Sequence, residues 1–142
     1  MFVQSDIENA AAQVISSSFA NLGITGVLIQ TGHDTGTLSY PLVQVICNNF
    51  TPDYPTLNIG YGKAELIIAV AGIKTQTTAS LFETIADAAI EPFFENNIVG
   101  TFNGYSTGIT TQALYDKGLD VQTLKDGWMA KQVLELVVAR TS

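Results

Sequence analysis

The segment from Leu57 to Val70 has the alternating pattern of one long strand, and it constrains the fold more than any other part of the chain. The alternation changes parity in the middle, at Gly62. Side chains of a strand point to opposite faces with a period of two, so the parity change requires one extra residue. The sequence therefore predicts a β-bulge near Gly62 and a strand that projects and pairs with another chain. The apolar sets are Leu57, Ile59 and Tyr61 before the change and Ala64, Leu66, Ile68 and Val70 after it.

Composition indicates one domain, residues 1–142, with little surface charge. A chain of this length buries a substantial core, and no repeat or linker divides it. Charged residues make up 13% of the sequence, against about a quarter in typical domains. We therefore expect another molecule to cover part of the surface.

Net charge and hydropathy exclude several classes of partner. Six basic and thirteen acidic residues give a net charge of −7, which argues against a nucleic-acid-binding surface and against docking on anionic membranes. The apolar runs Leu66–Ala71 and Val133–Ala139 are too short to span a bilayer. The N-terminus lacks the pattern of a signal peptide. The single Cys47 indicates a reduced, buried strand residue in a protein made in the cytoplasm.

Two helices are predicted from their capping and breaking residues. Ser5-Asp6-Ile7-Glu8 matches a capping box, which predicts a helix from Asp6 to Leu22. A second helix begins at Thr75–Thr78 and ends or kinks near Pro92. Its predicted buried face comprises Thr78, Phe82, Ile85, Ala86, Ala89 and Phe93.

The remaining chain predicts strands and connections, with glycines 100, 104 and 108 marking a mobile stretch. Asn48–Thr56 is expected to be a connection and Asp116-Lys117-Gly118 a turn. The predicted fold class is α+β: two helices packed on a mixed, mostly antiparallel sheet, in the order α-β-β-β-α-β-β. Besides the long strand, the predicted strands are Thr25–Gln30, Pro41–Cys47, Ile109–Tyr115 and Trp128–Ala139.

Two motif fragments match enzyme signatures incompletely. Gly104–Gly108 fits the G-x-S-x-G nucleophile elbow, which would make Ser106 a catalytic nucleophile. The elbow requires a strand-to-helix turn and a later histidine, whereas a strand-like segment follows and the single His33 lies upstream. Gly60-Tyr61-Gly62-Lys63 lacks the Ser or Thr and the helix of a phosphate loop. We therefore predict a protein that is not an enzyme and has no cofactor, with neither a catalytic nor a metal site.

Four carboxylates, Glu83, Asp87, Glu91 and Glu95, recur every four residues along the second predicted helix. A solvated polar face is the ordinary interpretation, and a hard-cation site would need ligands from further elements. Like charges four residues apart destabilise a helix by a few tenths of a kcal/mol, and no Lys or Arg on this helix offsets them. The row is therefore also consistent with a basic partner surface, or with an acidic lining that repels another molecule.

Loop residues supply the candidate interface. His33 and Asp34 lie in a polar loop, where a turn role is the alternative to a poised imidazole. Tyr54, beside Asp53 and between two prolines, is a candidate aromatic anchor for a partner or a cap on the core. Tyr105 belongs to the glycine-rich stretch and completes the candidate set.

The elements in order resemble the tail terminator (tail completion) proteins of long-tailed bacteriophages. The resemblance covers nearly the whole chain as a pattern of element order and length, and it carries over no catalytic residue. The similar features are the helix closing at Asn21-Leu22-Gly23-Ile24, the proline-led strand Pro41–Val45, the long strand through Tyr61–Val70, the helix Ala79–Ile90 and the closing strand Trp128–Val138.

The resemblance implies a virion protein of the tail or neck, synthesised in the host cytoplasm. Such subunits form a homo-oligomeric ring, of six subunits, that caps the tail tube and joins it to the head–tail connector or stopper. Six copies at −7 carry −42, so DNA would pass through the lumen without specific binding. The alternatives are another head–tail piece, such as an adaptor, stopper or tube protein, and a small hydrolase using Ser106 or a ligand-binding domain.

Overall fold

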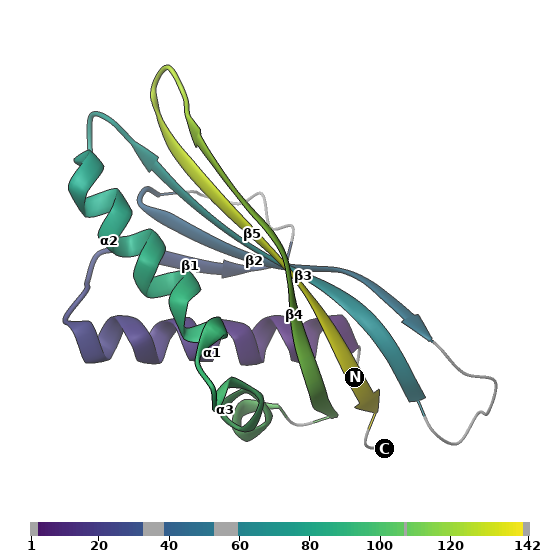
Figure 1. Ribbon diagram of the computed structural model, residues 1–142. Coiled ribbons are helices and arrows are strands. Elements are labelled where there is room, and N and C mark those ends of the chain that lie inside the picture. The colour runs from purple at the N-terminus through teal and green to yellow at the C-terminus, as the bar shows by residue number, and fades with distance from the viewer. Residues whose placement is uncertain (1–2, 33–38, 53–59, 107, 141–142) are drawn as a thin grey trace.

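A computed structural model describes residues 3–32, 39–52, 60–106 and 108–140 of the chain. Within these ranges, a five-stranded sheet carries three α-helices and one 3-10 helix (Figure 1). The α+β class is confirmed, but there is one α-helix more than predicted. The elements are α1 Val3–Leu22, β1 Leu28–Thr31, β2 Leu42–Pro52, β3 Gly60–Ile73, α2 Ala79–Ile90, η1 Glu91–Phe94, α3 Ile98–Tyr105, β4 Ile109–Thr123 and β5 Gly127–Arg140.

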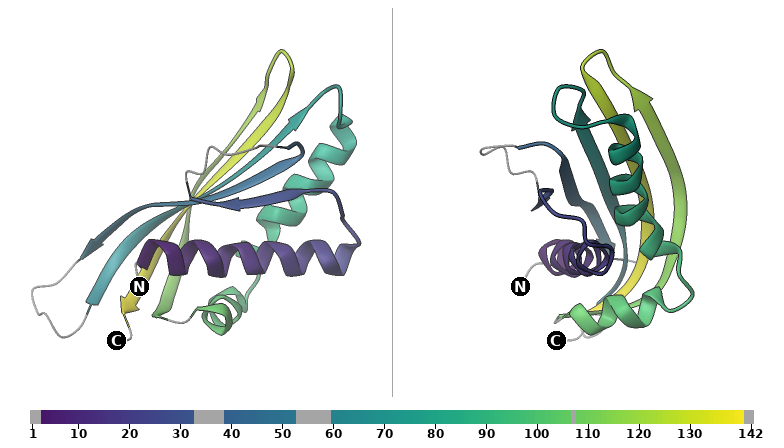
Figure 2. Two further views of the ribbon diagram at one scale, coloured as in Figure 1. Left: turned by 180° about the vertical axis from the view of Figure 1, so that it is seen from behind. Right: turned by 90° about the vertical axis from the view of Figure 1, so that its left-hand side faces the viewer.

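The sheet has the strand order β1-β2-β3-β5-β4, with β1 parallel to β2 and all other pairs antiparallel. The prediction of a mixed, mostly antiparallel sheet is therefore confirmed, and the long strand β3 lies at its centre. The helices lie on one face of the curved sheet (Figure 2). The ends of β2 and β3 project beyond the helices, at the lower right of Figure 1.

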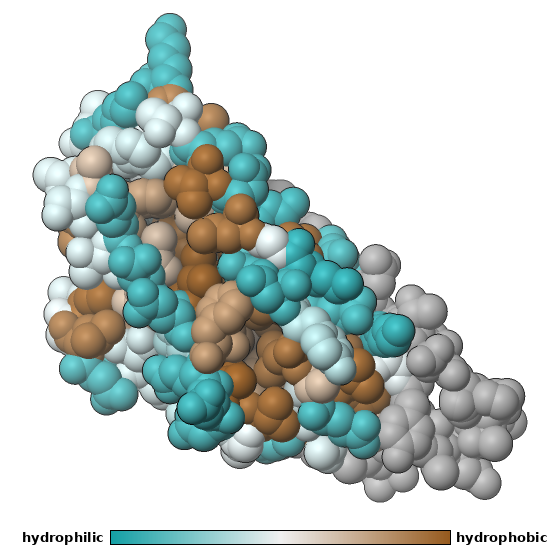
Figure 3. Space-filling view, viewed as in Figure 1, coloured by the Kyte–Doolittle hydropathy of each residue, from teal (hydrophilic) through white to brown (hydrophobic). Residues whose placement is uncertain are grey.

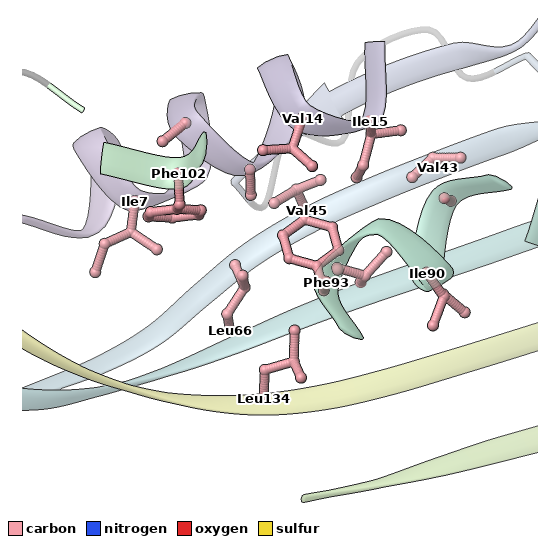
Figure 4. Close-up of a cluster of buried hydrophobic side chains, with 14 of the residues drawn as sticks. Ile7, Val14, Ile15, Val43, Val45, Leu66, Ile90, Phe93, Phe102 and Leu134 are labelled. Carbon is pink, nitrogen blue, oxygen red and sulfur yellow. The ribbon is translucent and has the colours of Figure 1, made fainter. Parts of the chain in front are cut away.

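The core lies between the helices and this inner sheet face (Figure 4). Alternate residues of β5 are buried, as its sequence predicts, and Cys47 is buried in β2. Trp128 is partly buried and stacks on Phe82 with ring centroids 5.9 Å apart. The buried β5 residues are Ala130, Gln132, Leu134, Leu136 and Val138.

Helix α1 begins at Val3, which places Ser5 inside the helix, so the predicted capping box is wrong. Val3 is buried against the core, and this packing extends the helix toward the N-terminus. Asp6 is also buried, and its Oδ2 accepts a hydrogen bond from the Gly108 N–H at 2.8 Å. Glu8 does not reach back along the helix but accepts a 2.8 Å hydrogen bond from the Cys47 N–H of β2.

The bulge predicted near Gly62 lies instead in the neighbouring strand. β3 pairs with β5 without interruption from Gly60 to Ile73. The register shift falls in β2 between Cys47 and Asn49, so Asn48 is the extra residue. Asn48–Pro52 therefore extends β2, where the sequence predicts a connection. Leu57 and Ile59 of the predicted long strand lie outside the described residues.

At each register shift of the sheet, a side chain forms a hydrogen bond with the backbone. Glu8 accepts from the N–H next to the β2 bulge. At the first shift in β4, Asn103 accepts from the Thr111 N–H at 2.6 Å and donates to its carbonyl at 2.9 Å. At the second, Asp116 Oδ1 accepts from the Gly118 N–H at 2.9 Å. These contacts supply the hydrogen bonds that each irregularity removes from the ladder.

The contact between Glu8 and the β2 bulge gives a testable expectation. Glu8→Ala removes an acceptor from a part-buried N–H and should destabilise the fold by about 1–3 kcal/mol in urea unfolding followed by circular dichroism. Glu8→Gln is the matched control, because its side-chain oxygen can still accept the bond, and it should lose less. Equal losses for both variants would show that the hydrogen bond contributes little.

Helix α2 follows the prediction except at Thr78, which was expected on the buried face but is exposed as the cap. Thr78 caps it, with Oγ1 accepting from the Leu81 N–H at 3.1 Å, and the helix gives way to η1 at Pro92. Beyond Pro92, Phe93 is buried, as predicted, and Phe94 is exposed.

The stretch containing Gly100 and Gly104 is a helix, α3, and the prediction of a mobile segment there is wrong. Helix propensity disfavours two glycines in eight residues. Buried Ile98 and Phe102 compensate by anchoring α3 in the core.

Asp116-Lys117-Gly118 is not the predicted turn. β4 continues through this segment to Thr123, with a register shift between Asp116 and Leu119. The chain reverses at residues 124–126, where the Leu124 N–H donates to the Gly127 carbonyl at 2.7 Å. The resulting β4–β5 hairpin extends beyond the helices at the top of Figure 1.

Candidate assembly surfaces

An apolar groove of about 470 Å³ lies between α2 and β4. We call it the α2–β4 groove. It exists because α2 packs on β3 and β5, leaving the inner face of β4 near the hairpin uncovered. Leu119 and Val121 of β4 are 56% and 61% exposed there, and Phe94 of η1 is 49% exposed. The other lining residues are Phe82, Glu83, Ala86, Asp87, Ile90, Glu91, Asp116, Ala130 and Gln132.

Three of the four carboxylates of the predicted acidic row form one wall of this groove. Glu83 and Asp87 of α2 and Glu91 of η1 all line it, and all are exposed. Figure 3 shows apolar side chains exposed between hydrophilic ones on the face that carries α2. This surface is not the solvated polar face that was the ordinary interpretation of the acidic row. Its apolar side chains are in contact with water, which is unfavourable in free energy until another surface covers them.

Glu95 belongs to a second hollow, between α1, α2 and α3, of about 370 Å³. Tyr105, a predicted interface residue, lies in the same hollow at the end of α3 and is exposed. Its hydroxyl lies 2.9 Å from Ser17 Oγ of α1, so it also links two helices within the chain.

The face of the sheet opposite the helices, which we call the outer sheet face, combines apolar residues with lysines. Ile67 of β3 lies directly opposite Val133 of β5 at its centre. Lys63 and Lys131 lie on either side of this pair along the strands. The residues of β3 and β5 on this face are Lys63, Glu65, Ile67, Ala69, Lys131, Val133, Glu135 and Val137.

Among the described strands, β4 forms one edge of the sheet and pairs only with β5. It is fifteen residues long and exposes Tyr115 as well as Leu119. At the opposite edge of the sheet, β1 has four residues and pairs only with Leu42–Val45 of β2. The rest of β2 has no contact with β1 in the ladder. Long apolar edge strands tend to pair with other chains.

The structure does not test the remaining predicted interface residues. His33, Asp34, Asp53 and Tyr54 lie outside the described residues. The groove residues of β4 were missed, because their exposure depends on β4 continuing past Gly118. The alternation Leu119-Asp120-Val121 was the available signal.

Ser106 follows helix α3 and precedes strand β4, the reverse of the strand-to-helix order of a nucleophile elbow. Its Oγ donates to the Phe102 carbonyl at 3.1 Å. The Gly60–Lys63 fragment lies in strand β3, which pairs with β5 without a bulge and continues to Ile73, so no helix follows the fragment as a phosphate loop would need. Within the described ranges, no three His, Cys, Asp or Glu side chains converge as a metal site would need, and no helix is long and apolar enough to cross a membrane.

Comparison with known proteins identifies a shared fold. No family model and no curated protein sequence matches the chain. Among solved structures, the chain is similar to one in the virion of a native gene transfer agent (GTA) particle. The two share 11% sequence identity with a TM-score of 0.58, over 90% of this chain and 93% of the other. The likeness therefore concerns the fold, and it extends over nearly the whole length of both chains.

Proposed function

We propose that this chain is a structural virion protein that forms a ring, of six subunits, at the end of a viral tail tube. The ring caps the tube and joins it to the head–tail connector, and DNA passes through its lumen. The observation that carries the proposal is the fold, which nearly the full length of the chain shares with a virion component. The resemblance in element order to tail terminator proteins favours the terminator position within such a particle.

The exposed surfaces are consistent with ring formation. The β4 edge, the α2–β4 groove and the outer sheet face all place apolar side chains in contact with water in a single copy. Closed symmetric assembly covers such surfaces on every subunit at once and leaves no edge for aggregation. The low overall charge, 13% of residues, agrees with extensive burial between subunits.

The net charge is compatible with passage of DNA. A ring of six such subunits carries −42, and like charge keeps duplex DNA from adhering to the lumen. The first Lys or Arg in the sequence is Lys63, so residues 1–62 contribute no basic side chain of this kind to a phosphate-binding surface.

Mass photometry of the purified chain, alone and mixed with tail-tube protein, tests the proposal, with negative-stain imaging of the same samples. Six copies of 15.2 kDa give a ring of about 91 kDa, free or seated on tube ends. Monomers that ignore tubes would contradict the proposal. Long cylinders of this chain alone would instead identify a tube protein.

A further inference from the structure

Charge is distributed unevenly between the two faces of the molecule. The helices α1, α2, η1 and α3 contain Asp and Glu but neither Lys nor Arg. All six basic residues lie in β3, β4, β5 or the turns that follow β3 and β4. The helices therefore carry anionic side chains and no cationic ones, whereas the outer sheet face carries Lys63 and Lys131. One cation, Lys74, lies on the helical side, over the ring of Trp128 that stacks on Phe82 of α2.

The carboxylates of the outer sheet face already have partners within the chain. Glu65 accepts a hydrogen bond from the Asn48 side chain at 3.2 Å. Glu135 lies 3.9 Å from the amine of Lys117. Lys63 and Lys131, by contrast, have no ion pair within 4 Å among the described residues. Asp120 of β4 lies directly opposite Lys131 on this face, and it accepts a hydrogen bond from the Gln122 side chain at 2.9 Å. The described charges on this face that have no such contact are therefore Lys63 and Lys131.

The α2–β4 groove has the complementary pattern. Its apolar floor is bordered by Glu83, Asp87 and Glu91, none of which has a cation within 4 Å in the described part of the chain. Between its lysines the outer sheet face presents Val133, which is partly exposed, beside Ile67, which is only 9% exposed in a single copy. Apolar surface would meet apolar surface, and carboxylate would meet amine, if the two faces came together.

We infer that the outer sheet face of a second copy of this chain packs over the α2–β4 groove. The two surfaces are different, so the contact is heterologous and repeats from subunit to subunit until a ring closes. The inference rests on the ring of the proposed function and names the surfaces that build it. It assigns the acidic row to a contact between subunits rather than to a lining that repels DNA.

Reciprocal charge reversal tests this pairing. One variant carries Glu83→Lys and Asp87→Lys, and the other carries Lys63→Glu and Lys131→Glu. Each variant alone should lose at least tenfold of the ring population in mass photometry, because like charges then meet at every contact. An equimolar mixture should recover the ring, since each reversed groove can receive a reversed sheet face. Native mass spectrometry should show three copies of each variant in that ring.

The control is Asn9→Lys with Gln13→Lys, which adds positive charge to an exposed part of α1 away from both surfaces. It should assemble like the wild type, and circular dichroism should show all variants folded. Rings that tolerate either reversal, or a mixture that recovers no ring, would overturn the inference while leaving the ring itself intact. A wild-type chain that forms no ring, even on tubes, would overturn the proposed function as well.

Discussion

Gly127→Ala is expected to destabilise the fold by about 3 kcal/mol, because the added methyl group would overlap backbone rather than a movable side chain. A Cβ at Gly127 would collide with the carbonyl oxygen of Gly72 in the adjacent strand β3. Gly127 is buried where β5 begins and pairs with Ile73. Relief of the clash requires the two central strands to separate. Urea unfolding monitored by circular dichroism measures the loss.

The matched control for this substitution is Gly100→Ala. A Cβ at Gly100 would meet nothing within 4 Å, and the residue is exposed inside helix α3. Alanine there should stabilise the fold by about 0.5–1 kcal/mol through helix propensity. The two identical substitutions are therefore expected to change stability in opposite directions. A loss at Gly100 similar to that at Gly127 would contradict the close approach of β3 and β5 as the cause.

The elements that the sequence predicted correctly carry their own local signals. Thr78 caps α2 and Pro92 ends it, and both act within one helical turn. The strict alternation along β5 likewise predicts its buried and exposed faces. Such features depend on residues close in the sequence, so they can be predicted without knowledge of the tertiary structure.

The elements that were missed depend on contacts between distant residues. Helix α3 has weak propensity and is held by Phe102 in the core. The β2 bulge at Asn48 is served by Glu8, thirty-nine positions from Cys47 along the chain. Asp116-Lys117-Gly118 has the composition of a turn, but the hairpin turns six residues later because the strand pairing with β5 continues. Local sequence does not contain this information.

The candidate site was predictable only in part. The spacing of the acidic row identified Glu83, Asp87 and Glu91 as one surface, and the absence of offsetting cations suggested a basic partner. The apolar half of the groove comes from Leu119 and Val121, which meet the acidic row only through the sheet order. The pattern along one helix therefore indicated the charge of this surface, but it did not indicate which strand lies beside it.

Phe102→Ala should destabilise the fold by about 3–5 kcal/mol and lower the thermal midpoint by roughly 10 °C. Phe102 is fully buried, and α3 packs against α1 on the side where Figure 4 places Phe102 near Ile7. Truncation to alanine leaves a cavity the size of the lost phenyl group between these helices. A single cooperative transition at lower temperature would show that α3 belongs to the same folding unit as the sheet. Differential scanning calorimetry makes this measurement.

The control, Phe94→Ala, makes the same truncation eight residues earlier, at a side chain that is 49% exposed in the α2–β4 groove. It should cost less than about 1 kcal/mol of stability, because little apolar area leaves the core. If a second copy covers the groove, Phe94→Ala should still weaken the ring, whereas Phe102→Ala at a temperature where it remains folded should not. Opposite rankings of the two variants in unfolding and in assembly would separate the residues that hold the fold from those that hold the ring. The same ranking in both measurements would mean that Phe94 supports only the fold.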